Sequence, residues 1–365
     1  MRPGHEGGPP RHPALLVAPD KFRGSLTAPE VVAAVAAAAE PLGWDIVARP
    51  MADGGEGMLD AFGGANRSSL VTGPHGRAVD ARWRLDDEVA VIESALASGL
   101  DLAGGGAAND PLAATSRGTG ELIAEAVRAG ATRIIIGLGG SAMTDGGLAA
   151  VESVVEGLDG SRPLDHDVEL LVACDVETVF TDAAQVFGPQ KGASPEQVKD
   201  LTERLHRVRA HYEERYEQWL SDPEVDLGAT PGSGAAGGLG GGLLVLGGRL
   251  VPGLPLVAEQ VGLDEALTRV DAVVTGEGGV DAESFKGKVV GGVVEAALQH
   301  DLPVLVLAGT VRPDTPSLPE QVSVVDLSRR FGEEASWAET SACIRRAVED
   351  DLPTLVPGPA GTPEP

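Results

Sequence analysis

Short apolar runs alternate with glycine-rich loops and helix-like stretches along most of the chain. The runs at residues 14–18, 133–138 and 170–174 have the length of strands and are rich in aliphatic side chains. Between such runs, residues 29–40 and 118–129 combine helical spacing of apolar positions with strong helix formers. This alternation predicts an α/β fold with parallel sheets.

The rest of the pattern predicts a hairpin, one long helix and two more buried strands. Residues 82–85 and 89–93 are expected to pair across a tight turn. Residues 195–220 carry charged and apolar positions at helical spacing and begin with a proline in the first turn. Residues 272–275 and 304–307 are expected to be strands that each run into a glycine loop.

Composition narrows the class of protein. A chain of 365 residues predicts two domains, and a net charge of -27 argues against nucleic acid and acidic membranes as partners. No apolar run is long enough to span a membrane. Cys174 and Cys343 supply neither a disulfide framework nor a metal motif, which favours a reducing, cytoplasmic location. Residues 1–13 and 357–365 are rich in glycine and proline, lack a signal-peptide pattern and are expected to be disordered.

Candidate functional residues follow the predicted strands. In parallel α/β sheets, ligands bind beyond the carboxyl ends of the strands. Loops at Asp20, Gly139, Asp175, Gly276 and Gly309 occupy such positions in this sequence. Carboxylates beside glycine or at strand ends add to this set: Asp20, Asp53, Glu56, Asp175, Glu277 and Asp281. Such carboxylates can hold Mg²⁺ or accept the proton of a substrate hydroxyl, although surface carboxylates are common in so acidic a chain.

Lysine is rare here and concentrated in loops. Among 28 basic residues, lysine occurs at Lys21, Lys191, Lys199, Lys286 and Lys288. All but Lys199 lie in segments flanked by glycine, where a flexible ammonium group can contact phosphate. The alternative is that some of these side chains only solvate loops.

Residues 137–147 form the strongest candidate for a phosphate-binding loop. They follow a predicted strand, precede a helix expected to start near Asp145, and present several backbone N–H groups to an anion. Ser141 and Thr144 can donate to phosphate, and Asp145 can hold Mg²⁺ or cap the helix. A tight turn that requires glycine explains each single glycine equally well.

Other nucleotide motifs are weak or absent. Residues 232–237 match the G-x-G-x-x-G pattern, but residues 224–231 make a poor strand before it. Close packing of small residues explains that match equally well. Gly287 and Lys288 are followed by valine, so the sequence lacks the G-x-x-x-x-G-K-[ST] motif of P-loop kinases. An NAD(P) oxidoreductase is the weakest reading, because no acidic residue is convincingly placed on a following strand to bind ribose.

Several ordered blocks together resemble the bacterial type-1 glycerate kinase family. They span roughly residues 14–311 and comprise APDKFRGSL at 18–26, ADGGEG at 52–57, SRGTGELI at 116–123, the 137–147 loop, ACDV at 173–176, VFGPQKGA at 186–193, residues 231–238, and TGEG at 275–278. The number and order of these blocks make the resemblance specific.

The resemblance implies ATP- and Mg²⁺-dependent phosphorylation of D-glycerate to a phosphoglycerate, with 2-phosphoglycerate as the expected product. It also implies two α/β lobes. A flavodoxin-like lobe with a parallel sheet combines residues 14–68 and 271–356, and an inserted α/β lobe covers residues 69–270.

Site roles can be assigned on the same basis. Catalytic roles are expected for Asp20, Lys21, Asp53, Asp175, Lys191 and Asp281. Substrate binding is expected for Lys21, Arg23, Ser25 and Glu56. Nucleotide binding is expected for Gly139, Gly140, Ser141, Thr144, Asp145, Lys191, Gly276, Glu277 and Lys288. Asp175 and Asp281 are the expected metal ligands.

The sequence departs from the family pattern near these positions. Gly279 and Glu283 stand where the family usually has arginine and glutamine, and Arg23 stands where it has lysine. The stretch after Asp175 is shortened, and Val290 replaces a usual proline. Two alternatives therefore stay open: a kinase of another small hydroxy acid, or a non-catalytic nucleotide- or anion-binding protein of the same fold.

Overall fold

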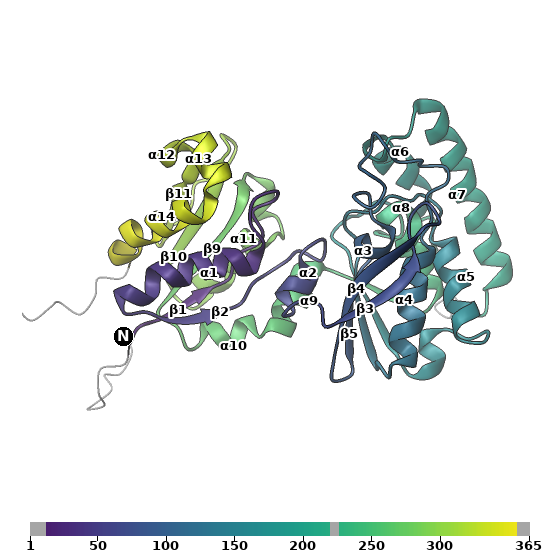
Figure 1. Cartoon of the computed structure of the whole chain (residues 1–365), viewed down its shortest axis with the longest axis horizontal. Coiled ribbons are helices and arrows are strands. Elements are labelled where there is room, and N and C mark those ends of the chain that lie inside the picture. The colour runs from purple at the N-terminus through teal and green to yellow at the C-terminus, as the bar shows by residue number, and fades with distance from the viewer. Residues whose placement is uncertain (1–11, 220–225, 356–365) are drawn as a thin grey trace, which may run out of the picture. The chain divides into compact units, whose positions relative to one another are not determined.

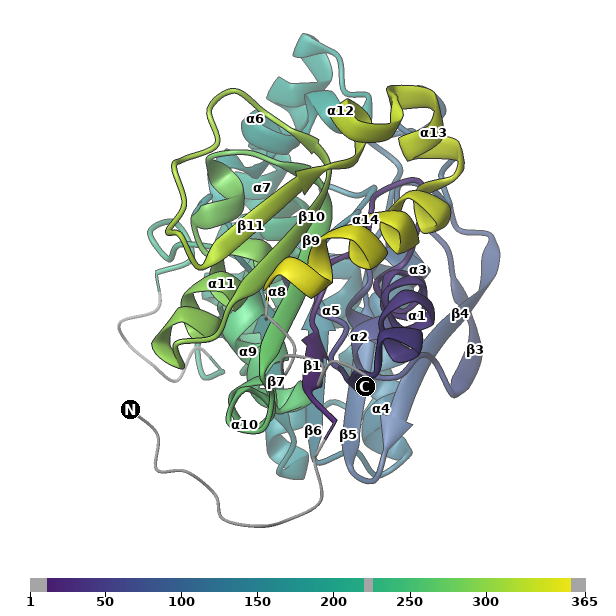
Figure 2. The same cartoon turned by 90° about the vertical axis from the view of Figure 1, so that its left-hand side faces the viewer.

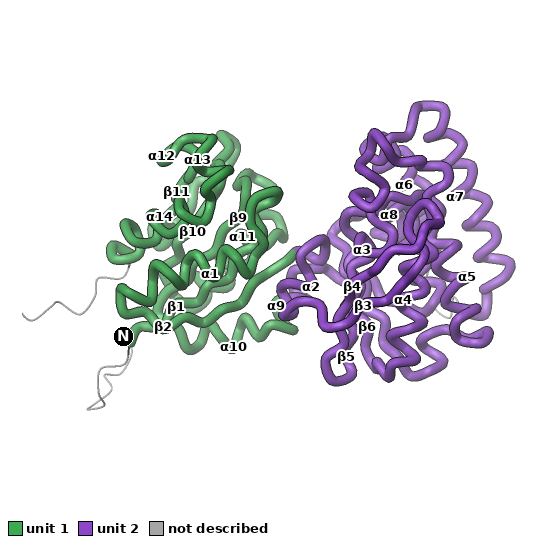
Figure 3. Tube along the Cα trace, in the orientation of Figure 1, with its two compact units in different colours: residues 1–52, 258–365 green, residues 53–257 purple. Residues whose placement is uncertain are grey.

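The computed structural model describes residues 12–219 and 226–355 (Figure 1). The chain divides into two compact units, one made of residues Met1–Ala52 and Ala258–Pro365 and the other of Asp53–Val257 (Figure 3). The chain thus leaves and re-enters unit 1 earlier than the expected boundaries at residues 68 and 271. Of the terminal segments expected to be disordered, only His12 and Pro13 are among the described residues.

Unit 1 is built on a five-stranded parallel sheet with the strand order β11-β10-β9-β1-β2. Numbered along the chain, this is the 2-1-3-4-5 order of flavodoxin-like folds. The expected flavodoxin-like fold class is therefore confirmed. The strands are β1 (Ala14–Val17), β2 (Asp45–Ala48), β9 (Ala272–Val280), β10 (Val304–Val311) and β11 (Val322–Asp326).

Helices cover both faces of this sheet. α1 (Ala28–Ala39) and α14 (Thr340–Leu355), from opposite ends of the chain, pack together over one face of the sheet (Figure 2). α11 (Val289–Gln299) packs against β9 and β10. Shorter helices complete unit 1: α10 (Leu263–Leu267), α12 (Leu327–Phe331) and α13 (Glu333–Ala338).

Local sequence explains why α1 begins where it does. Thr27 accepts a hydrogen bond from the backbone N–H of Glu30, and the Glu30 carboxylate accepts one from the Thr27 N–H, so both form a capping box. A proline in the first turn adds to this start signal. Val31 and Val35 are fully buried on the sheet-facing side, which fixes the helix to the core.

Unit 2 contains a mixed six-stranded sheet with the order β3-β4-β5-β6-β7-β8. The first three strands pair antiparallel, and β5 to β8 pair parallel. The expected hairpin is confirmed in β4 and β5. The strands are β3 (Arg67–Thr72), β4 (Ala78–Asp86), β5 (Val89–Glu93), β6 (Arg133–Gly137), β7 (Glu169–Ala173) and β8 (Arg249–Val251).

A large apolar core joins this sheet to its helices, with Trp83, Ile134 and Tyr212 among the most buried side chains. The helices are α2 (Met58–Ala61), α3 (Ala95–Ser98), α4 (Arg117–Arg128), α5 (Leu148–Gly157), α6 (Ala183–Phe187), α7 (Pro195–Arg215) and α8 (Ala235–Val245). α9 (Gly253–Val261) runs across the boundary between the two units. None of the helices in residues 12–219 and 226–355 is long and apolar enough to cross a membrane.

Four sequence-based boundaries were wrong. The helix expected at Asp145 begins at Leu148, because Gly146 and Gly147 adopt positive φ angles. The long helix ends at Arg215 instead of reaching residue 220, which itself lies outside the described residues. The strands expected at 272–275 and 304–307 continue to Val280 and Val311.

The strand extensions have a steric cause. Gly276 has no side chain, and a Cβ there would collide with the carbonyl of Leu307 on the neighbouring strand. A Cβ on Gly309 would likewise collide with the carbonyl of Gly278. Glycine therefore lets β9 and β10 run closely side by side in this stretch, where the sequence pattern suggested loops.

Candidate functional site

The carboxyl ends of three neighbouring strands in unit 2 lie at the same edge of the sheet. In the parallel register, Glu93 at the end of β5 pairs with Gly137 of β6, and Gly137 pairs with Ala173 of β7. The chain continues from these ends into the loops that carry most of the predicted site residues of this unit. The expectation that ligands bind at strand ends therefore has a definite place in the fold.

Residues 53–57 pass close to these strand ends. A Cβ on Gly139 would lie 2.8 Å from the Cα of Gly55, and a Cβ on Gly140 would lie 2.5 Å from Oε1 of Glu56. Gly140 also has a φ of +69°, which disfavours any side chain. The structure therefore brings together the predicted residues Glu56, Gly139 and Gly140, and glycine is what permits the approach.

Asp53 and Asp175 form an acidic pair at the same edge. Oδ1 of Asp175 accepts a hydrogen bond from the backbone N–H of Gly253 at 2.8 Å. Burial raises the pKa of Asp175; the Gly253 hydrogen bond opposes this, and the charge of Asp53 adds to it. A carboxylate whose ionised form is disfavoured by burial and by a neighbouring charge suits a divalent cation, which neutralises the charge. Mg²⁺ commonly uses only one or two protein carboxylates, with water and phosphate as further ligands.

No larger metal-binding cluster accompanies this pair. Within residues 12–219 and 226–355, no group of three or more His, Cys, Asp or Glu side chains is arranged to hold a metal ion. The donor set that fits Mg²⁺ is thus the Asp53–Asp175 pair. The second expected metal ligand, Asp281, belongs to unit 1.

Lys191 anchors the glycine loop, which we define as residues 139–147. Its Nζ is buried and donates hydrogen bonds to Oγ of Ser141 at 2.8 Å and to the carbonyl of Met143 at 2.6 Å. A neutral amine has two N–H groups, which these two acceptors satisfy; the ammonium form has a third. Burial lowers the pKa of Lys191 to about 7, although the charge of Asp145 opposes this shift.

Other polar groups fix the same loop. Asp145 accepts hydrogen bonds from both the backbone N–H and the hydroxyl of Ser116, at 2.8 and 2.9 Å, and from the N–H of Gly147 at 3.0 Å. Asn109 donates from Nδ2 to the carbonyls of Ala142 and Lys191, at 3.1 and 2.8 Å. The loop is therefore held from three sides before any ligand binds.

Thr144 is the exception among the polar side chains of the glycine loop. It is fully buried, and its hydroxyl has no hydrogen-bond partner in the described part of the chain. An unsatisfied buried hydroxyl is costly, so this group is a candidate donor or acceptor for a ligand. The predicted residues Ser141, Thr144, Asp145 and Lys191 thus gather around one loop.

The G-x-G-x-x-G match packs against this loop. A Cβ on Gly237 would collide with the carbonyl of Met143, and one on Gly238 would lie 2.8 Å from the Cα of Gly146. The carbonyl of Gly237 accepts a hydrogen bond from the N–H of Gly146 at 3.0 Å. Residues 226–231 before the match form no strand. The two interpretations left open were a dinucleotide-binding motif and close packing of small residues. The contacts of this segment fit close packing.

Unit 1 has its own group of predicted residues at the carboxyl end of β1. The N–H of Asp20 donates to the carbonyl of Gly276 at 2.9 Å, and the N–H of Lys21 donates to Oδ1 of Asp20 at 2.7 Å. A Cβ on Gly278 would lie 3.2 Å from the backbone nitrogen of Arg23. The loop carrying Asp20 to Ser25 therefore lies directly beside the segment that contains Gly276 and Glu277.

The remaining predicted residues of unit 1 lie between β9 and α11. Oδ1 of Asp281 accepts hydrogen bonds from the N–H groups of Glu283 and Ser284, at 2.9 and 3.0 Å. These bonds and the charge of Lys288 outweigh desolvation and lower the pKa of Asp281. Lys286 is exposed and pairs with Glu283 at 2.7 Å. Asp281 and Lys286, which are close in sequence to the family departures at Gly279 and Glu283, thus have partners within a few residues along the chain.

Sequence reasoning missed two residues at these sites. Glu93 is buried and accepts hydrogen bonds from the N–H groups of Gly57 and Leu59, at 3.1 and 2.8 Å. Its signal was a carboxylate directly after the apolar run of β5. Asn109 lies in a glycine- and alanine-rich stretch without periodicity, so no local signal identified it.

Comparison with known proteins identifies the family. Residues 15–154 and 156–350 match the glycerate kinase family. An Escherichia coli K12 protein named glycerate 2-kinase is 38% identical over 338 residues, covering 82% of this chain and 86% of that protein. A Bacillus subtilis 168 protein named glycerate kinase is 38% identical over 339 residues, with the same coverages of 82% and 86%.

A solved structure agrees with the sequence matches. The chain superposes with a TM-score of 0.77 and 33% identity on a crystal structure from Salmonella typhimurium LT2, provisionally described as glycerate kinase 2. The match covers 94% of this chain and 98% of that one. The resemblance seen in the sequence blocks is therefore confirmed over nearly the whole chain. The protein belongs to the glycerate kinase family of phosphotransferase enzymes.

Proposed function

We propose that this enzyme transfers the γ-phosphoryl group of ATP to a hydroxyl of D-glycerate, with 2-phosphoglycerate as the expected product. The observation that carries the proposal is the arrangement of side chains and loops at the edge of the unit 2 sheet. There the preformed glycine loop lies beside Glu56 and near the Asp53–Asp175 pair. Phosphoryl transfer depends mainly on positioning and on neutralising charge, and this arrangement offers donors for phosphate and carboxylates for a cation.

In this proposal, the backbone N–H groups of the glycine loop and the hydroxyls of Ser141 and Thr144 bind ATP phosphates. Lys191 and Asp145 act by holding the loop in shape, as their contacts suggest. Direct contact of Lys191 with phosphate stays a prediction. Asp53 and Asp175 would hold Mg²⁺, which neutralises phosphate charge when bound.

Unit 1 supplies the groups that we assign to glycerate. Lys21, Arg23 and Ser25 are proposed to bind its carboxylate, and Asp20 or Asp53 to accept the proton of its hydroxyl. Gly276, Glu277 and Lys288 stay proposed nucleotide contacts, and Asp281 a proposed metal ligand. The support for this group is that the loop after β1 lies beside β9.

The test is release of ADP by the purified protein with ATP, Mg²⁺ and D-glycerate, with phosphorus NMR to identify the product. A phosphoglycerate would support the proposal, and the position of the phosphate would decide between the two hydroxyls. Absence of ADP formation under conditions where ATP binds would contradict it.

The exposed Gly279 favours a second candidate, a kinase of another small hydroxy acid. Its position lacks the cation usual in the family, and the nearby Lys286 is paired with Glu283. A panel of small hydroxy acids compared by kcat/KM separates the two candidates. Higher kcat/KM for another acid than for D-glycerate would favour the second.

A further inference from the structure

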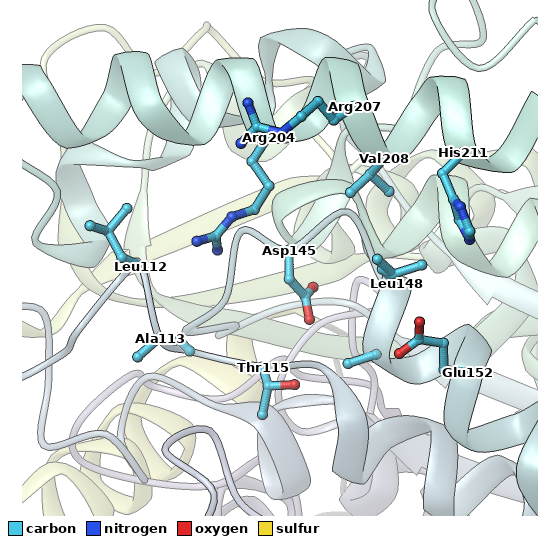
Figure 4. Close-up of a pocket in the computed structure, with 12 residues that line it drawn as sticks. Leu112, Ala113, Thr115, Asp145, Leu148, Glu152, Arg204, Arg207, Val208 and His211 are labelled. Atoms are coloured by element: carbon cyan, nitrogen blue, oxygen red, sulfur yellow. The ribbon is translucent and has the colours of Figure 1, made fainter.

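Unit 2 contains an open pocket of about 540 Å³, which we call the α7 pocket (Figure 4). Side chains of α7 and α5 and the segment 112–115 line it, and Asp145 of the glycine loop reaches into it. This volume lies within the usual range for small-molecule sites and exceeds what a three-carbon acid fills.

One face of α7 supplies the positive charge of this pocket. Arg204, Arg207, Val208 and His211 follow the spacing i, i+3, i+4 and i+7, which places them on the same helical face. Arg204 is half-buried and makes no hydrogen bond or ion pair in residues 12–219 and 226–355. Arg207 lies only 3.8 Å from Glu203, with both side chains about 70% exposed, so this pair is weak.

Other arginines without a partner in the described residues, such as Arg77, Arg82 and Arg345, are exposed, whereas Arg204 is half-buried. The protein has 55 acidic residues against 28 basic ones, so a carboxylate could readily have been placed opposite Arg204. Partial burial of an unpaired guanidinium costs solvation that an anion would restore, and the guanidinium fork fits phosphate in two-point contacts. The α7 face therefore indicates a phosphate-bearing ligand.

The rest of the pocket fits the body of a nucleotide. Leu112, Leu148 and Val208 provide apolar surface for a base. Arg204 points from α7 toward the side of Leu112 and Asp145, whereas Glu152 points into the pocket on the side of His211 (Figure 4). A carboxylate at that end can accept hydrogen bonds from ribose hydroxyls, away from the arginine end.

Asp145 does not compete with the ligand for Arg204. Its two carboxylate oxygens already accept three hydrogen bonds from Ser116 and Gly147. Desolvation by burial raises its pKa, which those hydrogen bonds oppose. Asp145 also belongs to the glycine loop, so a ligand in the pocket contacts the loop that we assign to ATP phosphates.

We infer that the α7 pocket binds a nucleoside phosphate, with the phosphate on Arg204 and Arg207 and the nucleoside over Leu148 and Val208. This inference deepens the proposed function, on which it rests for the identity of the nucleotide. Apart from Asp145, the residues of this nucleotide-binding surface lie outside the glycine loop and the family motifs.

The test is calorimetric titration of ADP into the full-length protein without glycerate. The double variant Arg204→Gln/Arg207→Gln should weaken ADP binding at least about tenfold, because two charged contacts to phosphate are lost. Ala149→Trp fills the pocket without changing its charge and should also weaken binding at least about tenfold. The control Lys199→Gln removes one charge from an exposed position of α7 outside the pocket and should change the ADP Kd less than about twofold.

Circular dichroism on all variants establishes that they fold. An unchanged ADP Kd in both the double arginine variant and Ala149→Trp would overturn the inference. Titrations with 2-phosphoglycerate and inorganic phosphate separate the sources of phosphate: arginine-dependent binding of either one but not of ADP would also overturn it.

Turnover of D-glycerate is measured separately on the same proteins. Wild-type turnover combined with an arginine-independent ADP Kd would contradict the α7 pocket and leave the proposed function intact. Arginine-dependent ADP binding without turnover of glycerate would support the α7 pocket and contradict the proposed function.

Discussion

The two units present their predicted site residues in different ways. In unit 2, the glycine loop is fixed by buried contacts from Lys191, Asp145 and Asn109. In unit 1, Arg23, Lys286 and Lys288 are exposed, and the ion pair of Lys286 is local. Buried polar contacts are costly to lose, whereas exposed pairs contribute little. Changes in unit 2 should therefore affect activity strongly, and changes on the exposed surface of unit 1 should tune it.

The largest effect is expected at the acidic pair of unit 2. Asp175→Asn should lower kcat at least about a hundredfold, because it removes a charge proposed to hold Mg²⁺. The melting temperature should not fall at neutral pH, since burial and Asp53 already disfavour the ionised carboxylate and asparagine can still accept from Gly253. Steady-state kinetics over a range of Mg²⁺ concentrations and thermal unfolding provide the two readouts. A loss of kcat below threefold would remove Asp175 from the site.

The next effect concerns the anchor of the glycine loop. Lys191→Met should lower kcat/KM at least about tenfold while the protein stays folded, because Ser141 and the Met143 carbonyl lose their shared donor. The matched control is Lys199→Met, which alters an exposed lysine of α7. Near-normal turnover of Lys191→Met would show that unit 2 does not depend on this anchor.

The same lysine predicts a dependence of stability on pH. With a pKa of about 7 when folded and about 10.5 when unfolded, Lys191 binds fewer protons in the folded state between these values. The free energy of unfolding of the wild type should therefore rise with pH across this window, relative to Lys191→Met, by up to about 1.4 kcal/mol per pH unit. Urea unfolding at pH 6 to 10 measures this. A constant difference between the two proteins over that range would contradict the buried, neutral amine.

The smallest effect is expected on unit 1. Gly279→Arg restores the cation usual in the family at an exposed position where a Cβ would meet no atom within 4 Å. The variant should fold normally and lower the KM for glycerate up to about fivefold, as befits an exposed charge. Gly279→Gln controls for size. If both variants have the same KM for glycerate, the charge at position 279 does not help to bind the acid. The contrast between the strong effects expected in unit 2 and the weak effects expected in unit 1 would then be larger.

Much of this outcome was readable from local sequence. Apolar runs predicted the strands around Ile134 and Leu171, and helical spacing at residues 29–40 predicted α1, because these signals act over a few residues. The glycine loop was found because glycines, hydroxyls and a carboxylate follow one another in one short segment. Recognition of ordered blocks supplied the family, which residue patterns alone left open.

Tertiary structure decided the rest, because the deciding contacts join residues distant in sequence. Lys191 was expected on phosphate, but its environment depends on Ser141 and Met143, about fifty residues away. Gly276 and Gly309 were expected in loops but lie in strands. Each packs against a carbonyl of the neighbouring strand, a contact that the sequence pattern does not reveal. The role inferred for Arg204 depended on the pocket that α7 and α5 line together. The sequence determined the elements, the family and the candidate loop; packing alone determined which charges are buried, paired or left to a ligand.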